Sequence, residues 1–203
     1  MPPALLGFAA REVAASRPAA DSTPASSAAP LAGIIVSMNV DHILRTLNEH
    51  RVEYILIGGM NFLLRHAPVL TFDVDVWIED TAKNRQRCEK ALGAIQAAWG
   101  ASDAEWGPVA DRKPGWLSHQ PVFCLTSPYG SIDVFRAVTG LDSWMDCRRR
   151  AYAGQTATGT IFLGLSDEDM LACQMALADN EQKPDRIRFL RRVTGKKEKE
   201  KAG

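Results

Sequence analysis

The chain has 203 residues, 46% of them hydrophobic, which is long enough for one domain with a substantial core. Lysine plus arginine equals aspartate plus glutamate at 24 each, so the overall charge gives no reason to expect a nucleic-acid-binding protein, although a local basic groove is compatible with it. The longest apolar run falls well short of the roughly 20 residues that span a membrane, so no membrane partner is expected.

The cysteines are spread along the chain. Cys88, Cys124, Cys147 and Cys173 form no C-x-x-C motif and have no paired histidines at ligand spacing, which argues against a zinc site. We interpret them as free thiols that behave as small buried hydrophobes. Free thiols are typical of a reducing compartment, so the predicted location is cytoplasmic.

Both ends of the chain differ in composition from its middle. Residues 1–37 are rich in Ala, Pro and Ser and have few large apolar side chains after Leu6 and Phe8, which predicts a disordered or spurious N-terminal extension before Met38. Residues 195–203 alternate lysine with glutamate and predict a disordered charged tail. A single domain is therefore expected over residues 38–194.

The first elements of this domain are a helix and a buried strand. Asp41 is a suitable N-cap for a helix that ends near His50, with Ile43, Leu44 and Leu47 at helical spacing. Residues 54–57 then form a short, β-branched apolar run that predicts a buried strand. This strand ends in Gly58 and Gly59, and an amphipathic segment follows over residues 60–66.

The next predicted strand, residues 70–78, carries the first candidate site. Asp73 and Asp75 point to one face, and Phe72, Val74 and Val76 point to the opposite face, where they can enter a core. Residues two apart on a strand are about 6–7 Å apart, so both carboxylates can reach one cation. Oxygen ligands favour Mg²⁺ or Mn²⁺ over zinc. The alternative is an exposed strand whose outer face is acidic.

The glycine pair adds a second candidate. A strand–Gly–Gly–helix turn can present backbone N–H groups at a helix N-terminus, which is a site for phosphate. The alternative is a tight turn without a ligand. Together with metal-binding carboxylates on the next strand, this arrangement suggests a nucleoside triphosphate and its metal ions.

Residues 79–135 contain the third candidate carboxylate. Glu79 and Asp80 are expected in a turn, a helix is predicted over residues 82–98 with Cys88, Leu92 and Ile95 on one face, and a Gly- and Pro-rich connection follows. Residues 122–125 and 131–135 then predict a β-hairpin. Asp133 lies in the apolar return strand, where a carboxylate is costly unless it is paired or bound to metal. The alternative is a surface position on an edge strand.

The C-terminal part reads as mainly helical. Helices are predicted over residues 141–151, 167–177 and 185–193, the second capped by Ser166, and a strand over residues 160–163. Two basic groups have two interpretations each. Arg65 and His66 either touch phosphate or base or form a solvated helix end, and the run Arg148-Arg149-Arg150 either contacts an RNA backbone or is a solvated helix face.

Gly58-Gly59 followed by Asp73-Val74-Asp75-Val76 resembles the signature of the DNA-polymerase-β-like nucleotidyltransferases. With Thr71 two residues before Asp73, the local form is similar to the AbiEii/AbiGii toxin-type branch of bacterial toxin–antitoxin and phage-defence systems. The resemblance implies an α/β (α+β) fold: a mixed sheet of nucleotidyltransferase type with flanking helices and a short helical C-terminal region.

The resemblance also implies an activity. A metal-dependent nucleotidyltransferase would move a nucleoside monophosphate from an NTP to a hydroxyl on tRNA, a protein or a small molecule such as an aminoglycoside, and a cognate antitoxin-type partner is implied as well. Asp73, Asp75 and Asp133 would hold Mg²⁺ or Mn²⁺, and Gly58 and Gly59 would cradle the β- and γ-phosphates.

One departure from the family keeps a second hypothesis open. The family commonly has a lysine on the C-terminal helix that would meet the triphosphate; here the position is Gln174, which carries no charge, while Lys183 lies in the next segment. The alternative function is a catalytically weak or inactive binding module that acts through a protein partner. Converging carboxylates favour the enzyme, and a basic residue in the cleft favours the module. A nuclease is a third option, in which the glycine pair has no evident role.

Overall fold

The computed structural model describes residues 38–66 and 69–195. The extension predicted over residues 1–37 and nearly all of the tail predicted over residues 195–203 lie outside the described residues. Within those two ranges, no helix has the length and apolar character that crossing a membrane requires.

Among residues 38–66 and 69–195, eight strands form one mixed sheet at the centre of the fold. Its spatial order is β4-β3-β5-β6-β2-β1-β8-β7. The pairs β1–β8 and β2–β6 are parallel, and the other neighbours are antiparallel. The strands are β1 Tyr54–Leu56, β2 Asp73–Ile78, β3 Ala98–Trp99, β4 Gly107–Pro108, β5 Val122–Ser127, β6 Gly130–Phe135, β7 Tyr152–Gln155 and β8 Ile161–Gly164.

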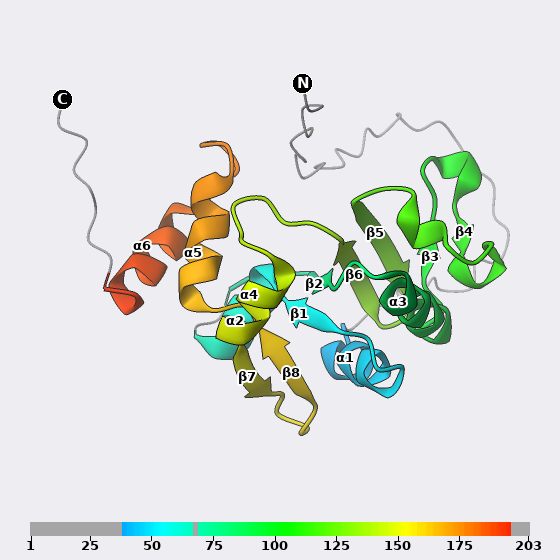
Figure 1. Ribbon diagram of the computed structural model, residues 1–203, viewed down its shortest axis with the longest axis horizontal. Helices are drawn as coiled ribbons and strands as arrows, with labels where there is room; N and C mark the ends of the chain where they lie inside the picture. Colours follow the sequence, from blue (N-terminus) through cyan, green and yellow to red (C-terminus); the bar gives the residue numbers. More distant parts are fainter. Residues whose placement is uncertain (1–37, 67–68, 196–203) are drawn as a thin grey trace, which may run out of the picture.

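Six α-helices of the described part of the chain flank this sheet, and the last two lie together at one end of the molecule, opposite the end that carries β3 and β4 (Figure 1). The helices are α1 Val40–Glu49, α2 Gly58–Arg65, α3 Ala82–Ala94, α4 Trp144–Arg150, α5 Asp167–Ala176 and α6 Pro184–Val193. The predicted fold class, a mixed α/β sheet with flanking helices and a helical C-terminal region, is confirmed.

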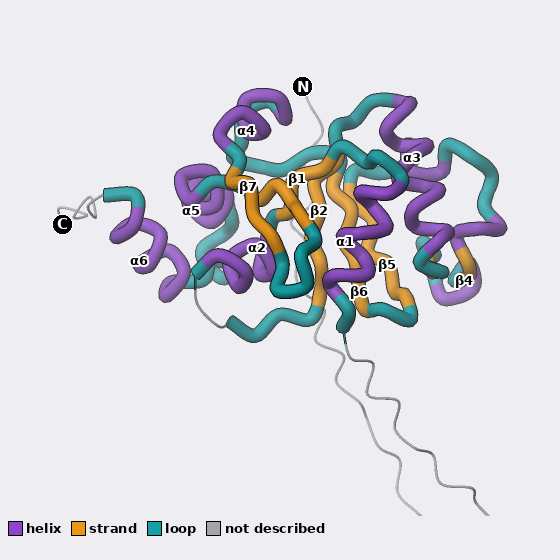
Figure 2. The backbone as a smooth tube through the Cα atoms, turned by 90° about the horizontal axis from the view of Figure 1, so that it is seen from below, coloured by secondary structure: helices purple, strands orange, loops and turns teal. Residues whose placement is uncertain are grey.

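The alternation of side chains along β1 and β2 divides the core into two clusters. Tyr54 and Leu56 of β1 pack with the buried residues of α1 and α3. Ile55 belongs to the other cluster, with Trp77 of β2 and apolar residues of α2, α4, α5 and α6. Helix α1 lies across the sheet in Figure 2. Because side chains alternate between the two faces of a strand, β1 and β2 each contribute residues to both clusters.

Several predicted boundaries were wrong in the first half of the chain. The N-cap of α1 is Asn39, whose side chain accepts the His42 N–H; Asp41 instead lies in the first turn of the helix. The predicted helix over residues 82–98 ends at Ala94, because Gln96 turns the chain with φ of 54°. Ala98 then enters the sheet as part of β3.

The predicted strand over residues 70–78 is shorter than expected. It begins at Asp73, so Phe72 precedes it and is 73% exposed instead of lying in the core, whereas Val74 and Val76 are fully buried as predicted. The pairing of β2 with β6 starts at Asp73, one residue after Phe72, so Phe72 is not held in the sheet.

Two other features differ from the sequence analysis. Strand β7 was not predicted; it is an edge strand whose side chains are mostly exposed, so it lacks an apolar pattern. Cys124 is exposed, and Cys173 is only half-buried, whereas Cys88 and Cys147 are buried as predicted. The hairpin of β5 and β6, and Ser166 as N-cap of α5 with its hydroxyl accepting the Asp169 N–H, are confirmed.

Candidate metal centre

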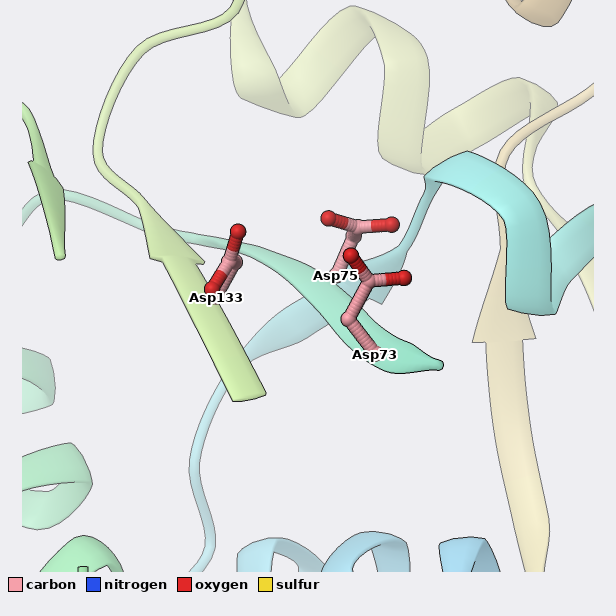
Figure 3. Close-up of side chains that lie close together, drawn as sticks. All are labelled: Asp73, Asp75 and Asp133. Carbon is pink, nitrogen blue, oxygen red and sulfur yellow. The ribbon is translucent and has the colours of Figure 1, made fainter. Parts of the chain in front are cut away.

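Three carboxylates from two neighbouring strands converge on one face of the sheet. The parallel register of β2 and β6 places Asp75 directly beside Asp133, and Asp73 lies two residues earlier on β2. One oxygen from each of the three carboxylates lies within 4.8 Å of the others. Figure 3 shows the three side chains rising from the same face toward a common space.

The apolar residues between these acids fix the face to which the acids point. Val74, Val76, Ile132 and Val134 are fully buried in the cluster that includes α1 and α3. A slip of one residue in either strand would move these valines and isoleucine out of the core and bury the carboxylates instead. Packing on one face therefore determines the geometry of the site on the other.

The three carboxylates create an excess of negative charge. Burial, together with the negative charges of Asp73 and Asp133, raises the pKa of Asp75 to about 7. Burial also raises the pKa of Asp133 to about 6, with a contribution from Asp73, while the Cys124 thiol, which donates to Asp133 Oδ2 at 3.4 Å, opposes the rise. Oxygen donors that cannot all ionise together fit a hard divalent cation such as Mg²⁺ or Mn²⁺, so Asp73, Asp75 and Asp133 can hold a metal ion.

The glycine pair lies against this cluster. Gly58 has φ of +66°, and a Cβ atom at this position would lie 1.9 Å from Asp75 Oδ2. A Cβ atom at Gly59 would lie 2.6 Å from Thr71 Oγ1. Both the backbone angle of Gly58 and the closeness of its neighbours therefore require glycine.

Helix α2 begins at Gly58, and the preceding Ile57 provides no side-chain cap. The first N–H groups of a helix have no partner within the helix, and here the Gly59 backbone N–H donates a hydrogen bond to the Asp75 carboxylate. The predicted phosphate cradle is thus placed next to the predicted metal ligands. Thr71 supports the same site, because its hydroxyl donates to Asp73 Oδ1 at 2.9 Å.

A cavity of about 140 Å³ opens beside the carboxylates and shares Asp75 and Gly58 with them. Its lining is mainly apolar, with two further polar side chains, Gln174 and Arg186. The complete lining is Ile57, Gly58, Asp75, Phe135, Val138, Leu165, Met170, Cys173, Gln174 and Arg186.

Arg186 is the residue at this site that the sequence analysis missed. It lies in the first turn of α6, half-buried, with its guanidinium carbon 5.3 Å from the centre of the Phe62 ring. Its charge holds the pKa of Asp75 down, against the effect of burial. Helical spacing could have indicated its position. Arg186 precedes the apolar Ile187 and lies one turn before the apolar Leu190, so it falls at the edge of the buried side of α6.

Gln174, at the position where the family commonly has a lysine, and Lys183 in the next segment differ in burial. Gln174 is buried, and its side-chain oxygen accepts the backbone N–H of Lys183 at 3.0 Å. Lys183 is exposed and does not line the cavity.

Other charged residues have structural partners away from the carboxylates. Arg65 and His66 both contact Asp167, and their side chains are 10% and 14% exposed, so the interpretation as a solvated helix end was wrong. Each arginine of the run 148–150 is paired with an acid: Arg148 with Glu53, Arg149 with Asp146, and Arg150 with Asp142 and Asp169. Asp80 lies in the predicted turn and bonds Arg136.

Comparison with known proteins adds little to this geometry. The fold is similar to a crystal structure from Thermotoga maritima described as a "putative nucleotidyltransferase", with 13% sequence identity over 76% of this chain and 89% of that chain, at a TM-score of 0.41. No protein-family model and no curated protein matches the chain. The function proposed below therefore rests on the site itself.

Proposed function

We propose that the chain is a metal-dependent nucleotidyltransferase that moves a nucleoside monophosphate from an NTP to a hydroxyl acceptor. The observation that carries this proposal is the convergence of Asp73, Asp75 and Asp133 beside the N-terminus of α2. Carboxylates for metal and backbone N–H groups for phosphate are the two elements that phosphoryl transfer requires of a protein.

Each residue has a defined role in this reaction. Asp73, Asp75 and Asp133 would hold Mg²⁺ or Mn²⁺, which would supply Lewis acidity to the phosphate and to the acceptor hydroxyl. The N–H groups of Gly58 and Gly59 bind the β- and γ-phosphates. The acceptor oxygen bonds the α-phosphorus as the bond to the β-phosphate oxygen breaks, and pyrophosphate leaves. Asp133 accepts the hydroxyl proton directly or through water.

The acceptor and biological setting are proposed from the resemblance of the Thr71–Val76 segment to the AbiEii/AbiGii toxin-type enzymes. The resemblance to these enzymes suggests tRNA, a protein or a small hydroxylated molecule as acceptor, and an antitoxin-type protein as partner. The pairing of Arg148, Arg149 and Arg150 with acids gives no support to an RNA-binding role for α4.

A second candidate function, a binding module without turnover, is favoured by the neutral Gln174 and by a basic residue, Arg186, at the edge of the cleft. Arg186 forms no ion pair with the carboxylates among the described residues, so it leaves their oxygens open to a metal. The enzyme is therefore the better supported of the two.

Calorimetric titration of ATP, CTP, GTP and UTP into the full chain, with Mg²⁺ and with a chelator, tests the proposal. We expect binding of at least one nucleotide that requires the metal and is lost in Asp73→Asn/Asp75→Asn. The matched control is Asp103→Asn, an exposed aspartate in the segment between β3 and β4. Incubation with the labelled nucleotide and candidate acceptors then identifies the product.

Folded wild-type protein that binds no nucleotide with Mg²⁺ or Mn²⁺ would overturn the nucleotidyltransferase. Metal-dependent nucleotide binding without transfer to any acceptor class would favour the binding module instead.

A further inference from the structure

We infer that Arg186 binds the terminal phosphates of the nucleotide, and so supplies from α6 the positive charge that Gln174 on α5 lacks. This inference rests on the proposed function and adds a specific phosphate-binding residue to its site.

The position of Arg186 is the first reason. It lines the cavity that also contains Asp75 and Gly58. One guanidinium nitrogen lies 3.7 Å from the position that a Cβ atom would occupy on Gly59, so it is adjacent to the start of α2. An anion held by the first N–H groups of α2 would therefore lie within reach of the guanidinium.

The lack of a protein partner is the second reason. Within residues 38–66 and 69–195, the Arg186 guanidinium makes no hydrogen bond or ion pair, and its contact is with the face of the Phe62 ring. By contrast, Arg136 and Arg150 are each held by carboxylates. Burial lowers the pKa of Arg186 because its charge is partly removed from water, and the charges of Asp75 and Asp73 oppose this effect. A bound anion would oppose it further, and a planar guanidinium matches the oxygens of phosphate.

The carboxylates do not fill this role. Asp75 and Asp73 are close enough for their charge to act on Arg186, yet neither is within ion-pair distance. A metal ion bound by the carboxylates would take up their negative charge and leave Arg186 to the phosphates. The site then has two separate centres of positive charge, one for each end of a triphosphate.

Gln174 explains why the charge comes from the next helix. Its side-chain oxygen accepts the N–H of Lys183, the residue that precedes α6. A lysine ammonium has no acceptor and could not make this bond. The neutral side chain at 174 therefore fixes the start of α6, and Arg186 lies in the first turn of that helix.

The test compares Arg186→Gln with Arg188→Gln, which removes an exposed arginine from the same helix. Inorganic tripolyphosphate with Mg²⁺ and ATP with Mg²⁺ are titrated by calorimetry at a pH above 8, and Mn²⁺ alone is titrated as well. We expect Arg186→Gln to weaken tripolyphosphate and ATP by about 10- to 100-fold, the range of a lost charge-assisted hydrogen bond. Arg186→Lys should recover part of the loss, and Arg188→Gln should match the wild type.

The metal titration separates a binding role from a structural one. Removal of a cation beside the carboxylates should leave the Mn²⁺ affinity unchanged or increase it, whereas a damaged site would bind both metal and phosphate less well. Equal tripolyphosphate affinity for Arg186→Gln and Arg188→Gln would overturn the inference. A gain in Mn²⁺ affinity without any loss of tripolyphosphate affinity would also overturn the inference, because Arg186 would then only occupy the place of a metal ion.

The two proposals fail in different ways. If the wild type binds no nucleotide and no tripolyphosphate with metal, the proposed function and this inference both fall. If the wild type binds nucleotide and Arg186→Gln binds it equally well, the nucleotidyltransferase stands and the assignment of Arg186 alone is wrong.

Discussion

The two faces of strands β2 and β6 differ sharply, although the residues of both faces alternate along the same two strands. On one face Val74, Val76, Ile132 and Val134 are fully buried against the cluster that includes α1 and α3. On the other face Asp73, Asp75 and Asp133 crowd together with raised pKa values for two of them. The apolar set forms a closed face, whose burial stabilises the folded state. The three aspartates form an acidic face, whose repelling carboxylates lower that stability until a ligand neutralises them.

The largest expected effect comes from placing a polar group on the closed face. Val76→Asn should lower the free energy of unfolding by on the order of 3–5 kcal/mol, because it removes apolar contacts and buries an amide without a partner. Urea denaturation at pH 8 measures the change. A loss below about 1 kcal/mol would show that the closed face is not the main source of stability.

The adjacent residue should respond in the opposite direction. Asp75→Asn removes a buried charge from a repelling cluster, so without metal at pH 8 it should raise the free energy of unfolding by on the order of 1–4 kcal/mol. The same variant should lose metal-dependent nucleotide binding. A variant that is both less stable and unable to bind metal would indicate that Asp75 has a structural role, and the contrast between the faces would fail.

The acidic face also predicts how stability depends on pH. The pKa of Asp75 is raised from 3.8 to about 7 and that of Asp133 to about 6, so the native state binds these protons more tightly than the unfolded chain. Their stabilising contribution is complete below about pH 4 and is lost as the pH rises through 6 and 7. The melting temperature of the metal-free protein should therefore fall between pH 5 and 8. The same fall should be smaller in Asp75→Asn, which lacks one of the two carboxylates.

Metal should reverse this trend. Binding requires ionised carboxylates, so the Mn²⁺ affinity should increase across the same pH interval, and saturating Mn²⁺ should flatten the stability profile. A Mn²⁺ affinity that does not change with pH would contradict the raised pKa values.

The smallest effects are expected from two glycines. Gly58 lies against the acidic face, and Gly93 lies in α3, which packs on the closed face. Gly58→Ala should cost about 1–2 kcal/mol for its left-handed backbone and should also weaken metal binding, because its Cβ atom would displace Asp75. Gly93→Ala in α3 meets no atom within 4 Å and should raise the free energy of unfolding by about 0.5–1 kcal/mol. Thermal melts and Mn²⁺ titrations of both variants measure this difference; equal responses would show that the site places no special demand on Gly58.

The elements with strong local signals were predictable. The hairpin of β5 and β6, the buried side of α1 and the Ser166 cap follow from alternation, helical spacing and a capping side chain. Elements without such a signal were missed: β7 is an exposed edge, and the segment from Ala94 to Trp99 changes from helix to strand at a residue of positive φ. Phe72 was misplaced because its hydrophobicity is local, whereas the start of β2 depends on pairing with β6.

The chemical groups of the site can be recognised from residue types and spacing: alternating aspartates, a third aspartate in an apolar strand, and a glycine pair at the start of a helix. That these groups meet cannot be recognised in this way, because the parallel register of β2 and β6 depends on core packing between residues about 60 positions apart. The same holds for Arg186, which has no motif. It lines the same cavity as Gln174 of α5, whose side chain accepts the N–H of Lys183 before α6, and a contact between two helices cannot be predicted from the spacing of residues within either one.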